Sequence, residues 1–281
     1  MGDLMEESRL QILVSAVNKD ARNLPEIMNI ESDAVIVDQI IGDTNGLDAF
    51  YTQDSDTEMD HNGSCVQILV RHEKGVGLSR NTAFEHSDRE IIQFADDDIV
   101  YDKGYVAKVL KEFDAHPEAD MLLFNVKAQE GRETYWNTDF AKVSWKNYGR
   151  YPAYAIFARR AKLEEAGVKY SLLFGGGAPY MNGEDSLFLH DCLAAGLSIY
   201  RTSVAVGHET KGESTWFKGY TDKFFFDRGV LYHFLYGKLA ILLGFRFLFN
   251  NRKTMCSEMG LFKCFKKLVA GVKHGKTLKK V

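Results

Sequence analysis

The order of apolar and polar positions in the N-terminal half predicts strands that alternate with helices. Residues 10–17 and 33–40 are apolar, β-prone runs with the length of buried strands. The residues between them, 18–30, have the length and apolar spacing of a short helix. This β-α-β opening favours parallel strands that are joined by a right-handed crossover.

The rest of the chain up to residue 215 continues this pattern and predicts an α/β fold. Ser79 is placed to cap a helix, and residues 103–117 and 184–196 have helical spacing. The segment 43–64 is rich in Asp, Asn, Gly and Thr, which is typical of a loop. Further strands are predicted at 65–72, 90–94, 119–128, 154–160 and 197–206.

The pattern changes at Trp216, where aromatic residues and leucines become dense but are interrupted by charged residues. The longest uninterrupted apolar stretch is 239–245, far below the ~20 residues that a membrane span needs. We therefore expect residues 216–281 to form an extension of amphipathic helices that packs on the body, on a partner or in a membrane interface.

Charge divides the chain in the same region. The net charge is −4, but the 31 residues from Asn251 onward hold nine Lys or Arg and one acid, so this tail carries about +8 and the rest about −12. The tail can be merely solvated, can contact nucleic acid or can bind an anionic membrane. The acidic body disfavours nucleic acid as a partner, because it would repel phosphates.

Composition indicates a folded cytoplasmic protein. Apolar residues make up 45% of the 281 residues, which is enough for a substantial core. The four cysteines show no CxxC spacing, so reduced thiols are expected and a structural zinc is not. The first residues are acidic rather than basic and apolar, so a signal peptide and export are not expected.

Three consecutive carboxylates, Asp96, Asp97 and Asp98, follow the predicted strand at 90–94. Like charges at this spacing repel, and burying them costs free energy. They would lie at the C-terminal end of a strand, where α/β folds bind ligands, and a turn at Asp97 would let them surround one Mg²⁺ or Mn²⁺ together with a diphosphate. The alternative is that they only end a strand and begin a turn.

A second group of residues combines glycines with two acids. Gly175, Gly176, Gly177 and Gly183 give backbone freedom just before Glu184 and Asp185, which begin the predicted helix at 184–196. One interpretation is that the acids only stabilise the N-terminal turn of that helix; the other is that one of them acts as a carboxylate base beside a loop that admits an acceptor.

His208 follows the predicted strand at 197–206. A lone histidine is more often structural than a ligand. Metal ligation becomes attractive only if the fold brings His208 back to Asp98.

Taken in order, these segments resemble a family 2 inverting glycosyltransferase with the GT-A fold. The resemblance runs from about residue 10 to His208 and includes VSAVN, VIVD, GVGLSRN and FADDD. It is closest in ARRAKLEEAGVKYSLLFGGGAPYMNGEDSLFLHDCLAAGLSIYRTSVAVGHE. It implies a Rossmann-like mixed sheet flanked by helices over residues 1–215, with a donor half at about 1–100 and an acceptor half at about 101–215.

The resemblance also implies an activity. The chain would be a hexosyltransferase that uses Mn²⁺ or Mg²⁺ and moves a sugar, with inversion, from a nucleotide-diphosphate sugar to an acceptor hydroxyl. A UDP-sugar is the favoured donor, and the acceptor would be a saccharide or lipid-linked saccharide in bacterial cell-surface polysaccharide or glycolipid synthesis. The enzyme would be cytoplasmic, with its basic tail on the inner face of the membrane.

The donor-side roles carry over from the family to single residues. Asp38 resembles the carboxylate that reads the nucleobase, and Arg80 the arginine that lies along the nucleotide. Asp96 and Asp98 fit the family's Asp-x-Asp pair and are both expected at the metal site. Asp98 is expected as the direct metal ligand, with Asp96 nearer the ribose or sugar and Asp97 also on the donor side.

The remaining roles concern the metal and the acceptor. His208 resembles the histidine that completes the metal site. Asp185 resembles the catalytic base, and Glu184 is the acid that precedes it on the acceptor side. The sequence departs from the family where Ser15, Ala16 and Val17 replace its usual Pro, Thr or Tyr near the base, and in the longer segment 43–64.

Two other functions fit parts of the sequence. The residues DDDIV also satisfy the Asp-x-Asp-x-Val motif of haloacid-dehalogenase-like phosphatases, with Asp96 as nucleophile and Asp98 as acid/base. That motif normally follows the first strand, whereas three predicted strands precede it here. The second alternative is a non-catalytic, membrane-recruited module that binds sugar nucleotides; such a module would not need Asp185.

Overall fold

The computed structural model describes residues 9–42, 48–181, 183–210 and 219–279, which form two compact units. The first unit comprises Met1–Lys74, Leu78–Tyr170 and Phe188–Gly212, and the second comprises Gly75–Gly77, Ser171–Leu187 and Glu213–Val281. The predicted domain boundary at residues 215 and 216 lies outside the described residues and stays a prediction.

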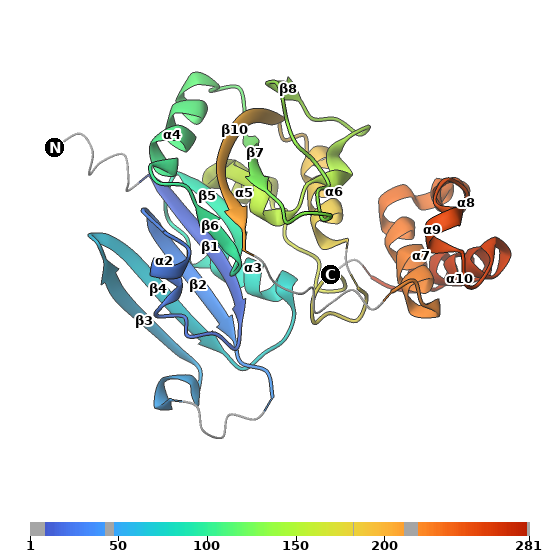
Figure 1. Ribbon diagram of the computed structural model, residues 1–281, viewed down its shortest axis with the longest axis horizontal. Coiled ribbons are helices and arrows are strands. Elements are labelled where there is room, and N and C mark those ends of the chain that lie inside the picture. The colour runs from blue at the N-terminus through green and yellow to red at the C-terminus, as the bar shows by residue number, and fades with distance from the viewer. Residues whose placement is uncertain (1–8, 43–47, 182, 211–218, 280–281) are drawn as a thin grey trace. The chain divides into compact units, whose positions relative to one another are not determined.

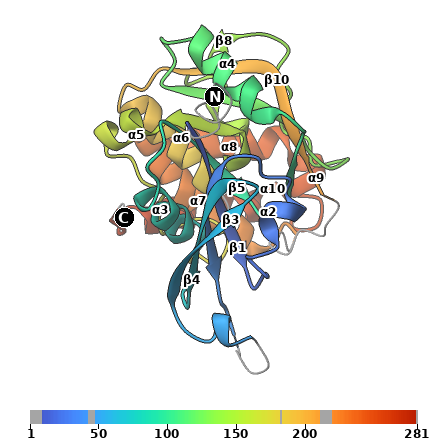
Figure 2. The same cartoon turned by 90° about the vertical axis from the view of Figure 1, so that its left-hand side faces the viewer.

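The first unit is built on one mixed ten-stranded sheet, as predicted for an α/β fold (Figures 1 and 2). The strand order is β3-β4-β2-β1-β5-β9-β7-β10-β6, and β8 pairs with β10. Strands β1, β2, β4 and β5 are parallel, whereas β9 lies antiparallel between β5 and β7. The bounds are β1 Leu10–Val17, β2 Asp33–Gln39, β3 Ser55–His61, β4 Ser64–Arg71, β5 Ile91–Asp96, β6 Ile99–Tyr101, β7 Met121–Lys127, β8 Ala141–Lys142, β9 Ile156–Arg159 and β10 Ile199–Glu209.

Helices flank this sheet. In α4 the residues at helical spacing that face the core, from Tyr105 to Phe113, are buried, which confirms the amphipathic helix predicted at 103–117. The predicted helix cap at Ser79 is wrong, because Ser79 is buried inside α3 and its hydroxyl donates to Ser15 Oγ at 2.9 Å. The bounds are α2 Leu24–Ile27, α3 Val76–Glu85, α4 Tyr105–Ala115, α5 Arg160–Ala166 and α6 Glu184–Ala194, with 3₁₀ turns at Ala49–Tyr51, Tyr148–Arg150 and Ala153–Ala155.

The first predicted helix is shorter than expected. Within 18–30, only α2 is helical, and it begins one residue before Pro25. Asn18 and Asn29 have φ of 51° and 54°, a left-handed conformation that does not propagate a helix. The backbone at these two asparagines therefore confines the helix to one turn.

The predicted loop at 43–64 is wrong over its second half, which forms the edge strand β3. This strand pairs antiparallel with β4, and Asn62 and Gly63 form the turn with φ of 55° and 88°. An Asn-Gly pair is the preferred two-residue hairpin turn. The strand escaped prediction because most of its side chains are polar and exposed, so that it lacks apolar alternation.

The second unit contains the predicted C-terminal helices. They are α7 Asp222–Tyr236, a 3₁₀ turn at Gly237–Leu239, α8 Ala240–Asn250, α9 Arg252–Met255 and α10 Leu261–Gly275. Helices α7 and α10 approach closely at two glycines: a Cβ on Gly229 would meet the Leu268 carbonyl, and one on Gly271 would meet the Phe226 carbonyl. Neither backbone can yield easily, so only glycine fits at these two positions.

Gly271→Ala should therefore lower the free energy of unfolding by about 1–3 kcal/mol, the usual effect of overpacking a tight contact. Chemical denaturation of the purified chain measures this change. Ala270→Met is the matched control, because it enlarges the exposed neighbouring residue and should change stability by less than about 0.5 kcal/mol. Equal effects of the two substitutions would contradict the close approach of α7 and α10.

Candidate active site

The predicted donor-side carboxylates lie at the carboxyl edge of the parallel strands. Asp38 in β2 pairs in register with Ala16 of β1, and Asp96 in β5 pairs with Ser15 on the other side of β1. The two acids thus flank β1 at nearly the same level, about 10 Å apart across two strand spacings. The chain order reverses between β1 and β5, and such a switch point is where open α/β sheets bind ligands.

Arg80 reaches this edge from α3. Its guanidinium donates from Nη2 to Asp96 Oδ1 at 2.9 Å and lies 4.9 Å from the centre of the Tyr170 ring. Tyr170 is itself buried and stacks on Phe188, with ring centres 4.1 Å apart. A packed aromatic layer therefore holds the buried arginine in place beside the acids.

Asp38 is fully buried, and burial is the main reason that its pKa rises to about 6. Its Oδ1 accepts a hydrogen bond from the Lys19 backbone N–H at 3.3 Å, and its Oδ2 is buried with no hydrogen-bond partner among the described residues. A buried acceptor without a partner is suited to a ligand that donates a hydrogen bond.

Asp97 and Asp98 form the turn between β5 and β6, so the predicted turn at the triple acid is confirmed. Burial raises the pKa of Asp97, and the Lys19 ammonium at 3.6 Å opposes that rise. Burial also raises the pKa of Asp98 to about 7, and the charges of Asp96 and Glu209 add to this effect. Burial and the neighbouring carboxylates therefore both disfavour the ionised forms of these two acids.

The residues that sequence reasoning missed are Lys19 and Glu209. Lys19 follows β1 at the carboxyl edge, and its position directly after VSAVN was the available signal. Glu209 lies at the end of β10 opposite Ile99 of β6, and it accepts a hydrogen bond from the Gln129 N–H at 2.9 Å. Its charge acts on Asp98, although no sequence motif marks it.

The predicted metal ligands lie on or beside strands of the same sheet. Asp96 and Asp98 are close enough to influence each other, and His208, which is exposed, pairs with Val100 of β6, two residues after Asp98. No group of three His, Cys, Asp or Glu side chains among residues 9–42, 48–181, 183–210 and 219–279 is arranged to hold a metal ion. The assignment of a metal to Asp96, Asp98 and His208 stays a prediction.

The predicted acid pair begins a helix as expected. Glu184 and Asp185 occupy the first turn of α6, where the helix dipole stabilises negative charge. Gly175 has φ of 101°, and a Cβ there would lie 2.8 Å from Glu184 Cδ, so the glycine loop packs directly on Glu184. Both acids belong to the second unit, and the approach of Asp185 to the donor site stays a prediction.

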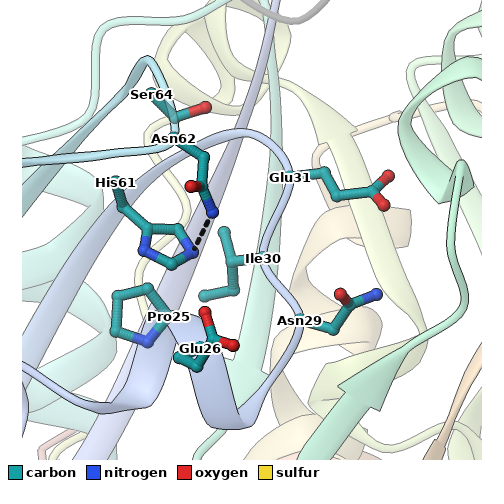
Figure 3. Close-up of a pocket in the computed structure, with 8 residues that line it drawn as sticks. All are labelled: Pro25, Glu26, Asn29, Ile30, Glu31, His61, Asn62 and Ser64. Atoms are coloured by element: carbon teal, nitrogen blue, oxygen red, sulfur yellow. Dashed lines mark hydrogen bonds between the residues drawn. The ribbon is translucent and has the colours of Figure 1, made fainter.

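A pocket of about 250 Å³ lies elsewhere in the first unit (Figure 3). Its residues precede β2 and β4 and so lie at the amino edge of the parallel strands, opposite Asp38 and Asp96. The His61 and Asn62 side chains contact each other there at 3.3 Å. The lining residues are Pro25, Glu26, Asn29, Ile30, Glu31, His61, Asn62 and Ser64.

Comparison with known proteins finds one family model. The sequence model described as Glycosyl transferase family 2 matches residues 44–171. A search of curated proteins found no match.

Solved structures share the fold. Staphylococcus aureus TarS in complex with UDP-GlcNAc matches with a TM-score of 0.59 at 17% identity, over 89% of this chain and 74% of that chain. A mannosyltransferase from Pyrobaculum calidifontis, in complex with GDP-Man and Mn²⁺, matches with a TM-score of 0.52 at 14% identity, over 97% of this chain and 76% of that chain.

Asp38→Asn should stabilise the ligand-free protein at pH 7.5. The raised pKa means that the folded state binds more protons than the unfolded state between about pH 4 and pH 6, so Asp38 makes stability fall as pH rises through that range. The gain in Tm should shrink as pH is lowered toward 4. Melting curves at pH 4.5 and 7.5 measure it, with Asp60→Asn on the exposed strand β3 as control. A gain in Tm that is the same at pH 4.5 and pH 7.5 would contradict the raised pKa of Asp38.

Proposed function

Because this chain is a family 2 glycosyltransferase of GT-A fold, we propose that it transfers a sugar from a UDP-sugar to an acceptor hydroxyl with inversion. The observation that supports this proposal best is the meeting of Asp38, Arg80 and the Asp96–Asp98 turn at the switch point of the sheet. The TarS structure contains UDP-GlcNAc, which favours a UDP-sugar, whereas the mannosyltransferase contains GDP-Man. The family assignment and the four strands before Asp96 argue against the phosphatase alternative.

The donor-binding residues divide their tasks by chemistry. Asp38 has a buried acceptor oxygen without a hydrogen-bond partner in the described parts of the chain, and it would bind a nucleobase N–H there. Arg80, already oriented by Asp96 and Tyr170, would place positive charge near the diphosphate as it leaves.

The turn at Asp97 and Asp98 fits a divalent cation. Its carboxylate oxygens are ligands that Mg²⁺ and Mn²⁺ accept. Burial, with a smaller contribution from the charges of Asp96, Glu209 and Asp97, raises the pKa of Asp98, and a bound cation would favour its ionised form. When bound, such a cation neutralises charge on a leaving diphosphate. Asp96 and Asp98 would hold it, with His208 as the further proposed ligand.

Asp185 is the proposed base. Its carboxylate would remove the proton from the acceptor hydroxyl, whose oxygen attacks the anomeric carbon from the face opposite the nucleotide. The bond from that carbon to the diphosphate oxygen breaks, and its electron pair leaves with the nucleotide. The configuration at the anomeric carbon therefore inverts in a single displacement, and Glu184 lies on the acceptor side of this step.

Asp185→Asn should keep donor binding but lower transfer at least about 100-fold, because the base is lost while the donor site is unchanged. A panel of sugar nucleotides, assayed for nucleotide release with Mn²⁺ and with EDTA, identifies the donor, and calorimetry measures its binding. Asp191→Asn, six residues farther along α6, is the control. Undiminished turnover by Asp185→Asn would contradict its role as base.

The acceptor and the location of the enzyme are proposed from the second unit. Large apolar side chains are exposed on and around α8, and we call them the C-terminal apolar patch. Phe245 contacts Phe265 with ring centres 5.2 Å apart, which connects α8 to α10 within the patch region. The C-terminal apolar patch consists of Leu239, Ile241, Leu242, Phe245, Phe249 and Phe262.

Exposed cations lie close in sequence to the residues of this patch. The 31 C-terminal residues carry about +8, and exposed lysines and arginines occur in the 3₁₀ turn at Gly237–Leu239 and in α8, α9 and α10. Apolar side chains within a cationic surface suit an anionic lipid interface. We therefore propose a cytoplasmic enzyme that binds peripherally to the inner face of a membrane and uses a lipid-linked saccharide acceptor. The flanking cations are Lys238, Arg246, Arg252, Lys253, Lys263 and Lys266.

Surface binding fits the helices better than spanning does. Asp222–Asn250 is long and apolar enough to cross a membrane by length and composition alone. Its first half, α7, contains the buried Asp227 and packs against α10, and Gly237 interrupts the helix with φ of 52°. We therefore assign protein packing to α7 and lipid contact to α8.

A Leu242→Glu, Phe249→Glu double variant should lose flotation with phosphatidylglycerol vesicles, because two carboxylates would enter the apolar interface. The affinity of this double variant for the sugar nucleotide should equal that of the unmodified chain. Ile27→Glu, at an apolar residue of α2 that is also exposed, is the control and should float normally. Equal flotation of the double variant would remove the membrane proposal, and self-association without flotation would point to a second copy of the chain.

A further inference from the structure

Helix α7 contacts the segment that leads into Glu184 and Asp185, and all residues involved belong to the second unit. The Asp227 carboxylate is buried and accepts a hydrogen bond from the Met181 backbone N–H at 2.9 Å. The Lys223 ammonium lies against the same oxygen of Asp227 and donates to the Pro179 carbonyl at 3.0 Å. One ion pair on α7 thus binds two backbone groups of the glycine-rich segment.

A third contact lies directly before the acid pair. Leu231 fills the space beside Gly183, whose φ is 110°, and a Cβ at that position would overlap the Leu231 side chain. Lys223, Asp227 and Leu231 are spaced four residues apart, so they follow one face of α7. These three side chains therefore contact residues 179, 181 and 183 in sequence along the helix.

Arg228 adds a charge next to this face. Its guanidinium lies over the rings of Phe224 and Phe247, at 5.3 Å and 5.5 Å from their centres. Glu184 is among the groups whose charge acts on Arg228, and it favours the protonated guanidinium against the effect of burial. Glu184 thus interacts electrostatically with α7, the helix whose side chains contact residues 179, 181 and 183 just before it.

We propose that Asp227, together with Lys223, is a positioning residue that fixes the backbone before α6 and thereby orients Asp185. This inference rests on the proposed role of Asp185 as base. It gives the C-terminal region a part in the reaction in addition to its proposed contact with lipid. A displacement of about 1 Å at a reacting group can lower a rate about 100-fold, so such support affects turnover without touching the donor.

The test compares Asp227→Ala, Asp227→Asn and Asp222→Ala in the full chain. Asn keeps an oxygen that can accept from the Met181 N–H but loses the charge that pairs with Lys223. Asp222→Ala is the matched control, since it removes another ion pair of α7, that with Lys267 of α10.

Hydrogen–deuterium exchange of the ligand-free chain is the first measurement. Asp227→Ala should increase exchange of the Met181 amide at least about tenfold, Asp227→Asn should increase it less, and Asp222→Ala should leave it unchanged. Turnover of the sugar nucleotide found in the Mn²⁺ screen is the second measurement. For Asp227→Ala, kcat should fall about 10- to 100-fold with the donor KM unchanged within about twofold, and Asp227→Asn should recover part of the loss.

The outcomes separate this inference from the proposed function. Unchanged Met181 exchange in Asp227→Ala, or increased exchange with unchanged kcat, overturns the positioning role. A loss of kcat accompanied by an equal loss of donor binding indicates general unfolding and also overturns it. If the unmodified chain turns over no sugar nucleotide, the proposed function fails, while the exchange data still decide whether Asp227 holds the segment.

Discussion

The pairing of β1 with β2 on one side and β5 on the other fixes the geometry of the proposed donor site. Because all three strands are parallel and buried, their carboxyl ends meet at one edge, and a shift of register in either pair would move Asp38 or Asp96 away from that edge. The apolar residues of these strands thus decide where the charges lie. Stability and chemistry depend on the same hydrogen-bonded ladders.

The charges at this edge are not balanced within the described residues. Asp38, Asp97 and Asp98 all have raised pKa values because burial disfavours their ionised forms. Arg80 and Lys19 offset part of the repulsion. Neutral side chains at some of these positions would make the protein more stable. The presence of buried acids there suits a site whose ligand brings positive charge or hydrogen-bond donors.

Much of the first unit could be predicted from the sequence, because buried strands such as 10–17 and 33–40 carry strong apolar patterns. The edge strand β3 could not, since its stability comes from pairing with β4 and from the Asn62–Gly63 turn rather than from burial. The resemblance to family motifs singled out Asp38, Arg80 and the triple acid, and the structure places them at one edge of the sheet, while their role in donor binding stays a proposal. Glu209 was missed because it reaches Asp98 only through the pairing of β10 with β6, which local sequence does not encode.

Strand β3 also affects how the protein behaves when many copies are present together. It ends the sheet and leaves one row of backbone groups open to another chain. Asp56, Glu58 and Asp60 alternate along it and so share one face. A second copy that added its own β3 there would bring acid against acid, and this repulsion opposes aggregation at an edge that no helix needs to cover.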